Sequence, residues 1–269
     1  MQWLPLALGI VVLALCYSQI IPSMVRDWYF DDNASHGFFI PLISLYIVWM
    51  RRSELATSPV DSSKIGLFLI AASVIMLVAG WLAFELFTMR LSLVIALCGC
   101  VLYWFGKRVF SLLASALLFL VYMIPLPAIV YNAVAFPLKL FVSWLSVGIL
   151  QAMGMMVVRE GNIIMFPNIT LEVVDACSGL RSLTALFALS TAYALILIRS
   201  PRHRIILVAS TLPIAVGANV LRVTVTGVLA RKFGAAAAEG FFHEFTGLVT
   251  FVLALAALAG LHQVLRRFK

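Results

Sequence analysis

Long apolar runs recur along this sequence and limit the folds that it can adopt. A helix that crosses a bilayer needs about 20 mostly apolar residues. We expect such spans at residues 3–21, 36–50, 65–87, 91–105, 109–124, 180–198, 205–229 and 245–265. Two of these runs, 36–50 and 91–105, are short and need their flanking residues to cross. The pattern predicts an all-α integral membrane protein with about eight spans.

Composition and charge agree with this class of protein. Hydrophobic residues make up 64% of the chain and charged residues 11%, against roughly 45–50% and about 25% in soluble domains. This favours one polytopic membrane domain over residues 1–269. The net charge is +8, but the basic residues form small clusters between apolar runs, as loop charges of membrane proteins do. We therefore expect contact with membrane lipids and no nucleic-acid partner.

The placement of the charges predicts the orientation of the spans. Basic clusters lie at 51–64, 107–108, 199–204 and 266–269, whereas the connections at 26–32 and 85–90 are acidic or mixed. Because basic loops stay in the cytoplasm, both termini are expected inside. The chain then belongs in the cytoplasmic membrane, with the connections at 26–32 and 85–90 on the outer face.

The segment between the fifth and sixth expected spans has a different character. Residues 128–153 are too few for two crossings, so this segment is expected to lie along the outer interface as a helix or to dip into it. Residues 155–174 are β-branched and partly alternating, with turns at 160–162 and 166–168, which predicts a short hairpin. Open strand edges are not tolerated in hydrocarbon, so the hairpin should lie outside the membrane.

A polar stretch around Cys177 follows the hairpin. Asp175 can cap a helix that begins at 176, which leaves Cys177 in the first turn and Arg181 one turn later. The positive end of the helix dipole and Arg181 would favour thiolate over thiol. The small side chain of Ser178 leaves room for a substrate backbone. The alternative is an inert packed thiol, with Arg181 as an interfacial anchor.

Two later polar features are expected on the same outer face. Arg222 lies inside an apolar run, and an ionisable residue there is costly enough to be a candidate functional residue. Asn219 is on the same helix face. His243, at the outer start of the last span, is the histidine best placed to exchange a proton with Cys177, whereas His36 is a weaker competitor with a supporting role. The alternatives are an arginine that snorkels to the headgroups and a structural histidine.

These residues resemble the exosortase/archaeosortase family. The likeness rests on Ala176-Cys177-Ser178-Gly179-Leu180-Arg181, Asn219-x-x-Arg222 and His243 followed by Gly247, with His36-Gly37, Pro125-Leu126-Pro127 and Glu160-Gly161-Asn162 in support. It implies a membrane cysteine protease or transpeptidase acting on C-terminal sorting segments of secreted proteins, which consist of a short motif such as Pro-Glu-Pro, a transmembrane helix and a basic cluster. It also implies that Cys177 is the nucleophile, His243 the acid/base and Arg222 the third catalytic residue.

The expected chemistry is acyl transfer through a thioester. Arg222 would stabilise the oxyanion, a role in which one donor is typically worth about 10²–10³ in rate, and His243 would protonate the leaving amine. Arg181 either attracts an acidic residue of the sorting motif or tunes the thiol. The outer features contain no His or Cys pair at metal-ligand spacing and no Gly-rich phosphate loop, so we expect no cofactor. Whether water or an acceptor nucleophile resolves the thioester stays open.

Two other classes of function fit parts of this sequence. One is a non-enzymatic polytopic carrier or assembly subunit for envelope polysaccharide, in which Arg181 and Arg222 bind an anionic group. The other is a thiol redox protein, which needs a second cysteine on the outer face. Cys16, Cys98 and Cys100 lie inside apolar runs and are not placed there.

Overall fold

The structure is a computed structural model that describes residues 3–173, 180–234 and 241–267. Cys177, Asp175 and Ser178 lie outside the described residues. The chain divides into two compact units, Met1–Pro127 and Ala128–Lys269, and each is described by itself. Helices dominate both units, as expected for a chain whose backbone polar groups must be satisfied within each apolar segment.

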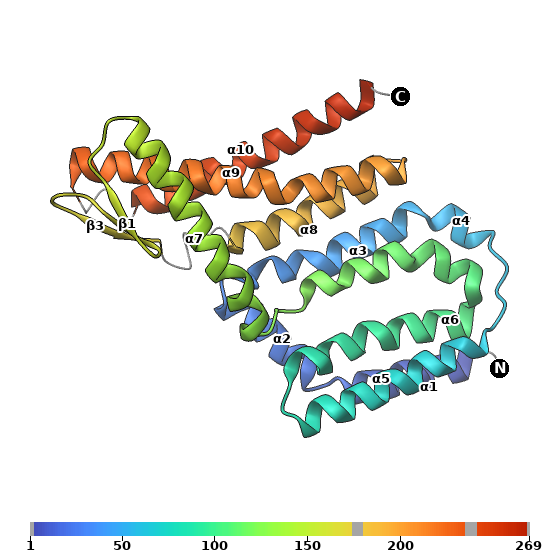
Figure 1. Cartoon of the computed structure of the whole chain (residues 1–269). Coiled ribbons are helices and arrows are strands. Elements are labelled where there is room, and N and C mark those ends of the chain that lie inside the picture. The colour runs from blue at the N-terminus through green and yellow to red at the C-terminus, as the bar shows by residue number, and fades with distance from the viewer. Residues whose placement is uncertain (1–2, 174–179, 235–240, 268–269) are drawn as a thin grey trace. The chain divides into compact units, whose positions relative to one another are not determined.

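Unit 1 is helical throughout its described part (Figure 1). Its elements are α1 (Trp3–Cys16), α2 (Ile20–Phe30), η1 (Ser35–Phe38), α3 (Phe39–Met50), α4 (Arg52–Ala56), α5 (Lys64–Leu82), α6 (Leu86–Phe119) and η2 (Leu120–Met123). The first expected span breaks after Cys16, and the helices on either side of the break meet at an angle of 56°.

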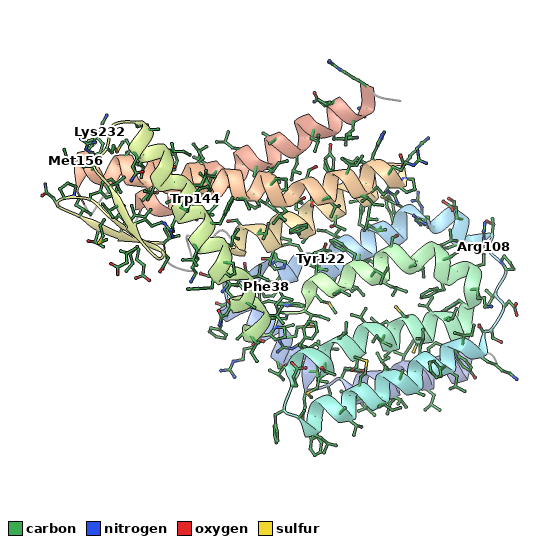
Figure 2. The ribbon with its side chains drawn as sticks, in the orientation of Figure 1. Phe38, Arg108, Tyr122, Trp144, Met156 and Lys232 are labelled. Atoms are coloured by element: carbon green, nitrogen blue, oxygen red, sulfur yellow. The ribbon has the colours of Figure 1, made fainter. Side chains whose placement is uncertain are left out.

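Helix α6 consists of two helical halves that meet at Gly106. The backbone there has φ 82° and ψ −177°, a conformation that residues with a Cβ rarely adopt. A Cβ would also overlap the carbonyl oxygen of Asp61. Figure 1 shows the chain folding back at this point, and Figure 2 labels Arg108 at the bend. The bend falls between the expected spans 91–105 and 109–124.

Glycines bring α5 and α6 into backbone contact. A Cβ on Gly66 would overlap the backbone nitrogen of Tyr103, and a Cβ on Gly99 would lie 2.9 Å from the backbone nitrogen of Ile70. Small residues of this kind allow close packing between helices in a membrane, where van der Waals contact drives association. The first half of α6 is therefore held tightly against α5.

The structure corrects part of the assignment of residues 26–32 and 85–90 to loops: Asp31, Asp32 and Glu85 lie between helices, but residues 26–30 and 86–90 are helical. Asp27 lies within α2, and Arg90 lies within α6 with only 3% of its side chain exposed. Arg90 Nη2 donates to Asp27 Oδ2 at 2.6 Å and to Ser23 Oγ at 3.4 Å. The helix begins directly after Glu85 because that carboxylate accepts hydrogen bonds from two N–H groups of the first turn. The opposite charges of Asp27 and Arg90 therefore mark a contact between two helices.

Unit 2 combines helices with a small sheet. Its elements are α7 (Ala128–Ala152), β1 (Val158–Glu160), β2 (Ile163–Met165), β3 (Thr170–Glu172), α8 (Leu180–Leu197), α9 (Pro201–Phe233) and α10 (Phe241–Arg267). The segment expected to form one hairpin holds three antiparallel strands in the order β1-β2-β3. Ile164 of β2 and Val173, which follows β3, pack in one cluster with Leu150 of α7 and Val223 of α9.

Helix α7 is a single helix of 25 residues that contains Pro137. By length and composition it could cross a membrane, so placement along the outer interface stays a prediction. In Figure 1, α8, α9 and α10 run roughly along one another, whereas α7 crosses them obliquely. Helix α7 packs against α9, and Ser146 of α7 donates to the carbonyl oxygen of Val220 at 3.3 Å.

The described residues contain five helices that are long and apolar enough to span a membrane, or six if the bent pair in α1 and α2 counts as one span. The chain is thus a multi-pass membrane protein, but the count of about eight is not confirmed. The counts differ because α6 counts once despite its bend and the apolar helices Ser35–Met50 and Ser182–Leu197 are shorter than the others, whereas α7, which is not among the expected spans, is counted.

Candidate active site

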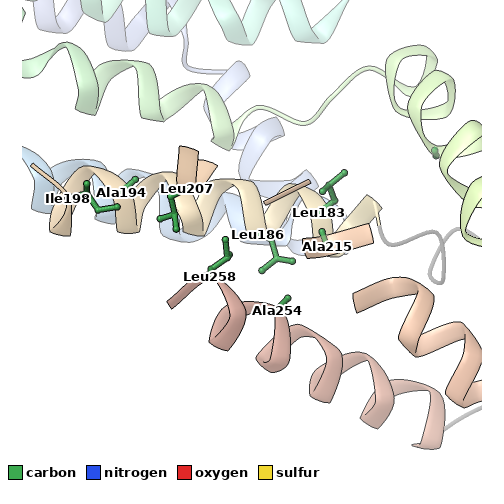
Figure 3. Close-up of a cluster of buried hydrophobic side chains, with 9 residues drawn as sticks. Leu183, Leu186, Ala194, Ile198, Leu207, Ala215, Ala254 and Leu258 are labelled. Atoms are coloured by element: carbon green, nitrogen blue, oxygen red, sulfur yellow. The ribbon is translucent and has the colours of Figure 1, made fainter. Parts of the chain in front are cut away.

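Three helices of unit 2 are locked in register by contacts along their length. Thr211 Oγ1 of α9 donates to Ser190 Oγ of α8 at 2.8 Å. Tyr193 of α8 shares a hydrogen bond of 2.6 Å with Nδ1 of His262 on α10. Apolar side chains between these helices, among them Leu186, Ala215 and Ala254, are buried in one cluster (Figure 3). The three helices therefore cannot slide past one another without breaking several contacts.

This register fixes the position of the first residue of α8 along the axis of α9. Because α8 and α9 are antiparallel and Ser190 lies opposite Thr211, each step back along α8 is a step forward along α9. Leu180, the first residue of α8, then comes level with Leu221 and so with the turn of Arg222. Cys177 precedes this residue by three positions.

Arg222 points toward α10 and is buried. The residue is 8% exposed, and its guanidinium lies against Gly247, where a Cβ would be 3.0 Å from Nη2 and 3.1 Å from Cζ. A snorkelling arginine would extend its head toward the headgroups, which this packing does not fit. Asn219, one turn earlier on α9, is 6% exposed. The face predicted to carry Asn219 and Arg222 is therefore a buried face between helices.

Position 243 lies near Arg222 along the helix axes. His243 is in the first turn of α10, one turn before Gly247. Because α10 runs antiparallel to α9, this position is level with the turn of α9 that follows Arg222, about 6 Å further along the axis. Arg181 is the second residue of α8. The backbone thus brings positions 181, 222 and 243 to one end of the three-helix layer.

His36 belongs to unit 1, where it lies in η1 and is half-buried. Its neighbour Gly37 packs under the indole of Trp28, which a Cβ at position 37 would overlap. Trp28 Nε1 donates to the carbonyl oxygen of Met123 at 2.7 Å. One tryptophan thereby ties the His36-Gly37 pair to the end of η2, immediately before the Pro125-Leu126-Pro127 turn. Sequence reasoning missed this role of Trp28.

Sequence reasoning also missed the contact between Gly247 and Arg222. A glycine in an apolar helix was the available signal, and it does not identify the side chain that fills the space. Thr250, one turn later, donates its hydroxyl to the carbonyl oxygens of Thr246 and Gly247 at 2.8 and 3.0 Å. The carbonyl groups of α10 beside the guanidinium therefore accept additional hydrogen bonds from a side chain of the same helix.

The site as described can bind and stabilise a negative charge. Arg222 supplies a buried guanidinium whose N–H groups can bind an oxyanion by charge-assisted hydrogen bonds. Among the described residues, no group of three or more His, Cys, Asp or Glu side chains is arranged to hold a metal ion.

The comparisons with known proteins identify one family. Residues 28–260 match the family model described as transmembrane exosortase (Exosortase_EpsH). This match begins in α2 and ends in α10, so it covers most of the chain and runs through both units. No curated protein and no solved structure matches the chain significantly.

Proposed function

Because the chain belongs to the transmembrane exosortase family, a family of cysteine transpeptidases and proteases, we propose that it cleaves the C-terminal sorting signal of exported proteins through a thioester. Family membership suggests the role of a membrane transpeptidase. The observation that carries the proposal is the buried guanidinium of Arg222, level with the start of the helix that Cys177 precedes.

In this proposal Cys177 is the nucleophile. Leu180, three positions after Cys177 in the sequence, is level with the turn of Arg222, and three residues of chain span at most ~10 Å. The thiolate attacks the scissile carbonyl carbon, and the carbonyl oxygen becomes an oxyanion that Arg222 stabilises. One such donor is worth about 10²–10³ in rate.

His243 carries the proton in both halves of the reaction. The tetrahedral intermediate collapses, the C–N bond breaks, and His243 gives its proton to the leaving amine. A thioester to Cys177 remains. Water or an acceptor nucleophile then attacks the thioester, His243 takes the proton from that nucleophile, and the thiolate leaves. The same residues therefore support hydrolysis and transpeptidation.

The remaining predicted site residues have supporting roles in this proposal. They are Asp175, Ser178, Arg181, Asn219 and His36. Asn219 has the clearest basis, because it is buried one turn from Arg222 on the same helix. We assign the whole chain to one functional domain because the family match runs through both units. We place the active site on the outer face of the cytoplasmic membrane because the basic clusters mark the opposite side.

Co-expression with a substrate that carries a sorting tail tests the proposal. Tail removal is followed as a shift in gel mobility. Cys177→Ala is expected to abolish the shift, and Arg222→Ala to slow it by about 10²–10³. Cys100→Ala, in α6 of unit 1, is the matched control and should process normally. Wild-type processing by Cys177→Ala would refute the proposal and leave a non-enzymatic carrier as the better explanation.

A further inference from the structure

We propose that Gly247 is a positioning residue for the reaction, because the space left by its missing side chain holds the guanidinium of Arg222 where it can stabilise the oxyanion. This inference rests on the proposed function, since it concerns the group that stabilises the oxyanion. Its structural basis is the contact between the two residues, in which Nη2, Cζ and Nη1 would lie 3.0, 3.1 and 3.5 Å from a Cβ at position 247.

The two backbones at this contact are fixed from outside it. Toward the far end of the helices, Tyr193 bonds His262 of α10 and Ser190 accepts from Thr211 of α9. Between these bonds and Arg222, the buried cluster around Ala215 and Ala254 joins α9 to α10. A side chain added at position 247 therefore cannot be accommodated by sliding α10, and the movement falls on the guanidinium.

The expected displacement of the guanidinium is small in ångströms, but it is large compared with what catalysis tolerates. Ordinary contacts to a Cβ begin near 3.4 Å, so an alanine would push Nη2 and Cζ by a few tenths of an ångström. Oxyanion donors must lie about 2.7–3.1 Å from the oxygen, and catalytic groups must be held within about 0.5 Å of their productive geometry. A misplacement of 1 Å can lower a rate by about 10²-fold.

Alanine and valine at position 247 give a graded test in purified enzyme with a tail-bearing peptide substrate. We expect Gly247→Ala to lower kcat by about 3–10-fold and Gly247→Val by about 10²-fold or more, with KM little changed. A change confined to kcat indicates an interaction made in the transition state, whereas general loosening of the fold would lower the active fraction and the melting temperature.

Two glycines elsewhere in these helices are matched controls. Gly260 is also in α10 and Gly217 is in α9, and a Cβ at either position meets nothing within 4 Å. Alanine is the better helix former at all three positions. Gly260→Ala and Gly217→Ala should therefore be at least as stable as the wild type and equally active. Gly247→Ala should be about as stable but slower.

A double-mutant cycle with Arg222→Lys separates this contact from other effects. The lysine ammonium is a compact charge that lacks the planar fork of the guanidinium, so a Cβ at position 247 has less to displace. Gly247→Ala should then change kcat less than about 2-fold in the Arg222→Lys background. The same fold loss in both backgrounds, or wild-type kcat in Gly247→Ala, would overturn the positioning role.

The outcome also distinguishes this inference from the function on which it rests. If processing requires Cys177 but is unaffected by Gly247→Ala and Gly247→Val, the inference is wrong and the proposed function stands. If processing persists in Cys177→Ala, the proposed function is wrong and the positioning role falls with it. If processing requires Cys177 and the cycle shows the expected coupling, both hold.

Discussion

Removing Asp27 is expected to destabilise unit 1 far more than removing Arg90, although the two side chains form one ion pair. The asymmetry follows from their burial, because the side chain of Arg90 is 3% exposed and that of Asp27 is 39% exposed. Asp27→Ala leaves a buried guanidinium with Ser23 Oγ, at 3.4 Å, as its remaining partner in the described part of the chain. Arg90→Met leaves a carboxylate that is partly exposed at the protein surface.

The magnitudes follow from this difference. Breaking a buried pair so that one charge is stranded costs about 3–5 kcal/mol, and partial exposure of the pair places Asp27→Ala near 2–3 kcal/mol on that scale. Arg90→Met removes the buried charge and fills much of its volume, so its cost should be about 1 kcal/mol or less. The double variant should resemble Arg90→Met, which gives a coupling of about 2–3 kcal/mol in magnitude.

Reversible unfolding in mixed detergent micelles measures these free energies. Arg26→Met is a matched control, because Arg26 is an exposed residue of α2 whose guanidinium lies 5.8 Å from the centre of the Phe30 ring. Its effect should stay within about 0.5 kcal/mol. Equal costs for Asp27→Ala and Arg90→Met, or additive effects in the double variant, would refute the reasoning from burial.

Two further predictions concern α6. Gly106→Ala forces a side chain into a left-handed backbone position and against the carbonyl oxygen of Asp61, so it should destabilise the protein by at least about 1–2 kcal/mol in the same unfolding assay, and an unchanged free energy would contradict it. Hydrogen bonding from Thr88, opposed by burial and reinforced by the N–H of Phe87, lowers the pKa of Glu85. The stabilisation that the Glu85 carboxylate provides is therefore present above the unfolded pKa of about 4.3 and is lost as the pH falls through the folded pKa. The difference in unfolding free energy between wild type and Glu85→Ala should shrink in acid, and a constant difference would argue against this role.

The helical class and most helix positions could be predicted from the sequence, because apolar runs long enough to cross a membrane leave few other folds open. The use of charges as loop markers was less dependable. Arg90 and Asp27 lie inside helices because each neutralises the other across α2 and α6, and no local pattern reveals such a pairing. The segment before Cys177 forms three strands, since both of its turns lie between paired strands.

In the candidate site, too, some residues could be predicted from the sequence and others could not. Arg222 could be identified because an ionisable residue inside an apolar run requires a partner or a function, and its burial agrees with that expectation. The role of Gly247 could not, because it depends on the register of α9 and α10, which residues far along both helices set. Trp28 was missed for a similar reason, since its partner Met123 lies about a hundred positions away in the chain.

The length of α9 beyond Arg222 sets a requirement for any substrate. Phe233, the last residue of the helix, lies eleven positions after Arg222, a distance of about 16 Å along the axis. An extended peptide advances at most ~3.3–3.6 Å per residue. A polypeptide that enters from the tip of α9 must therefore contribute roughly five extended residues before its reacting bond reaches the arginine. For the proposed cleavage, a tail that enters by this route with a shorter spacer is therefore expected to escape, whatever its motif.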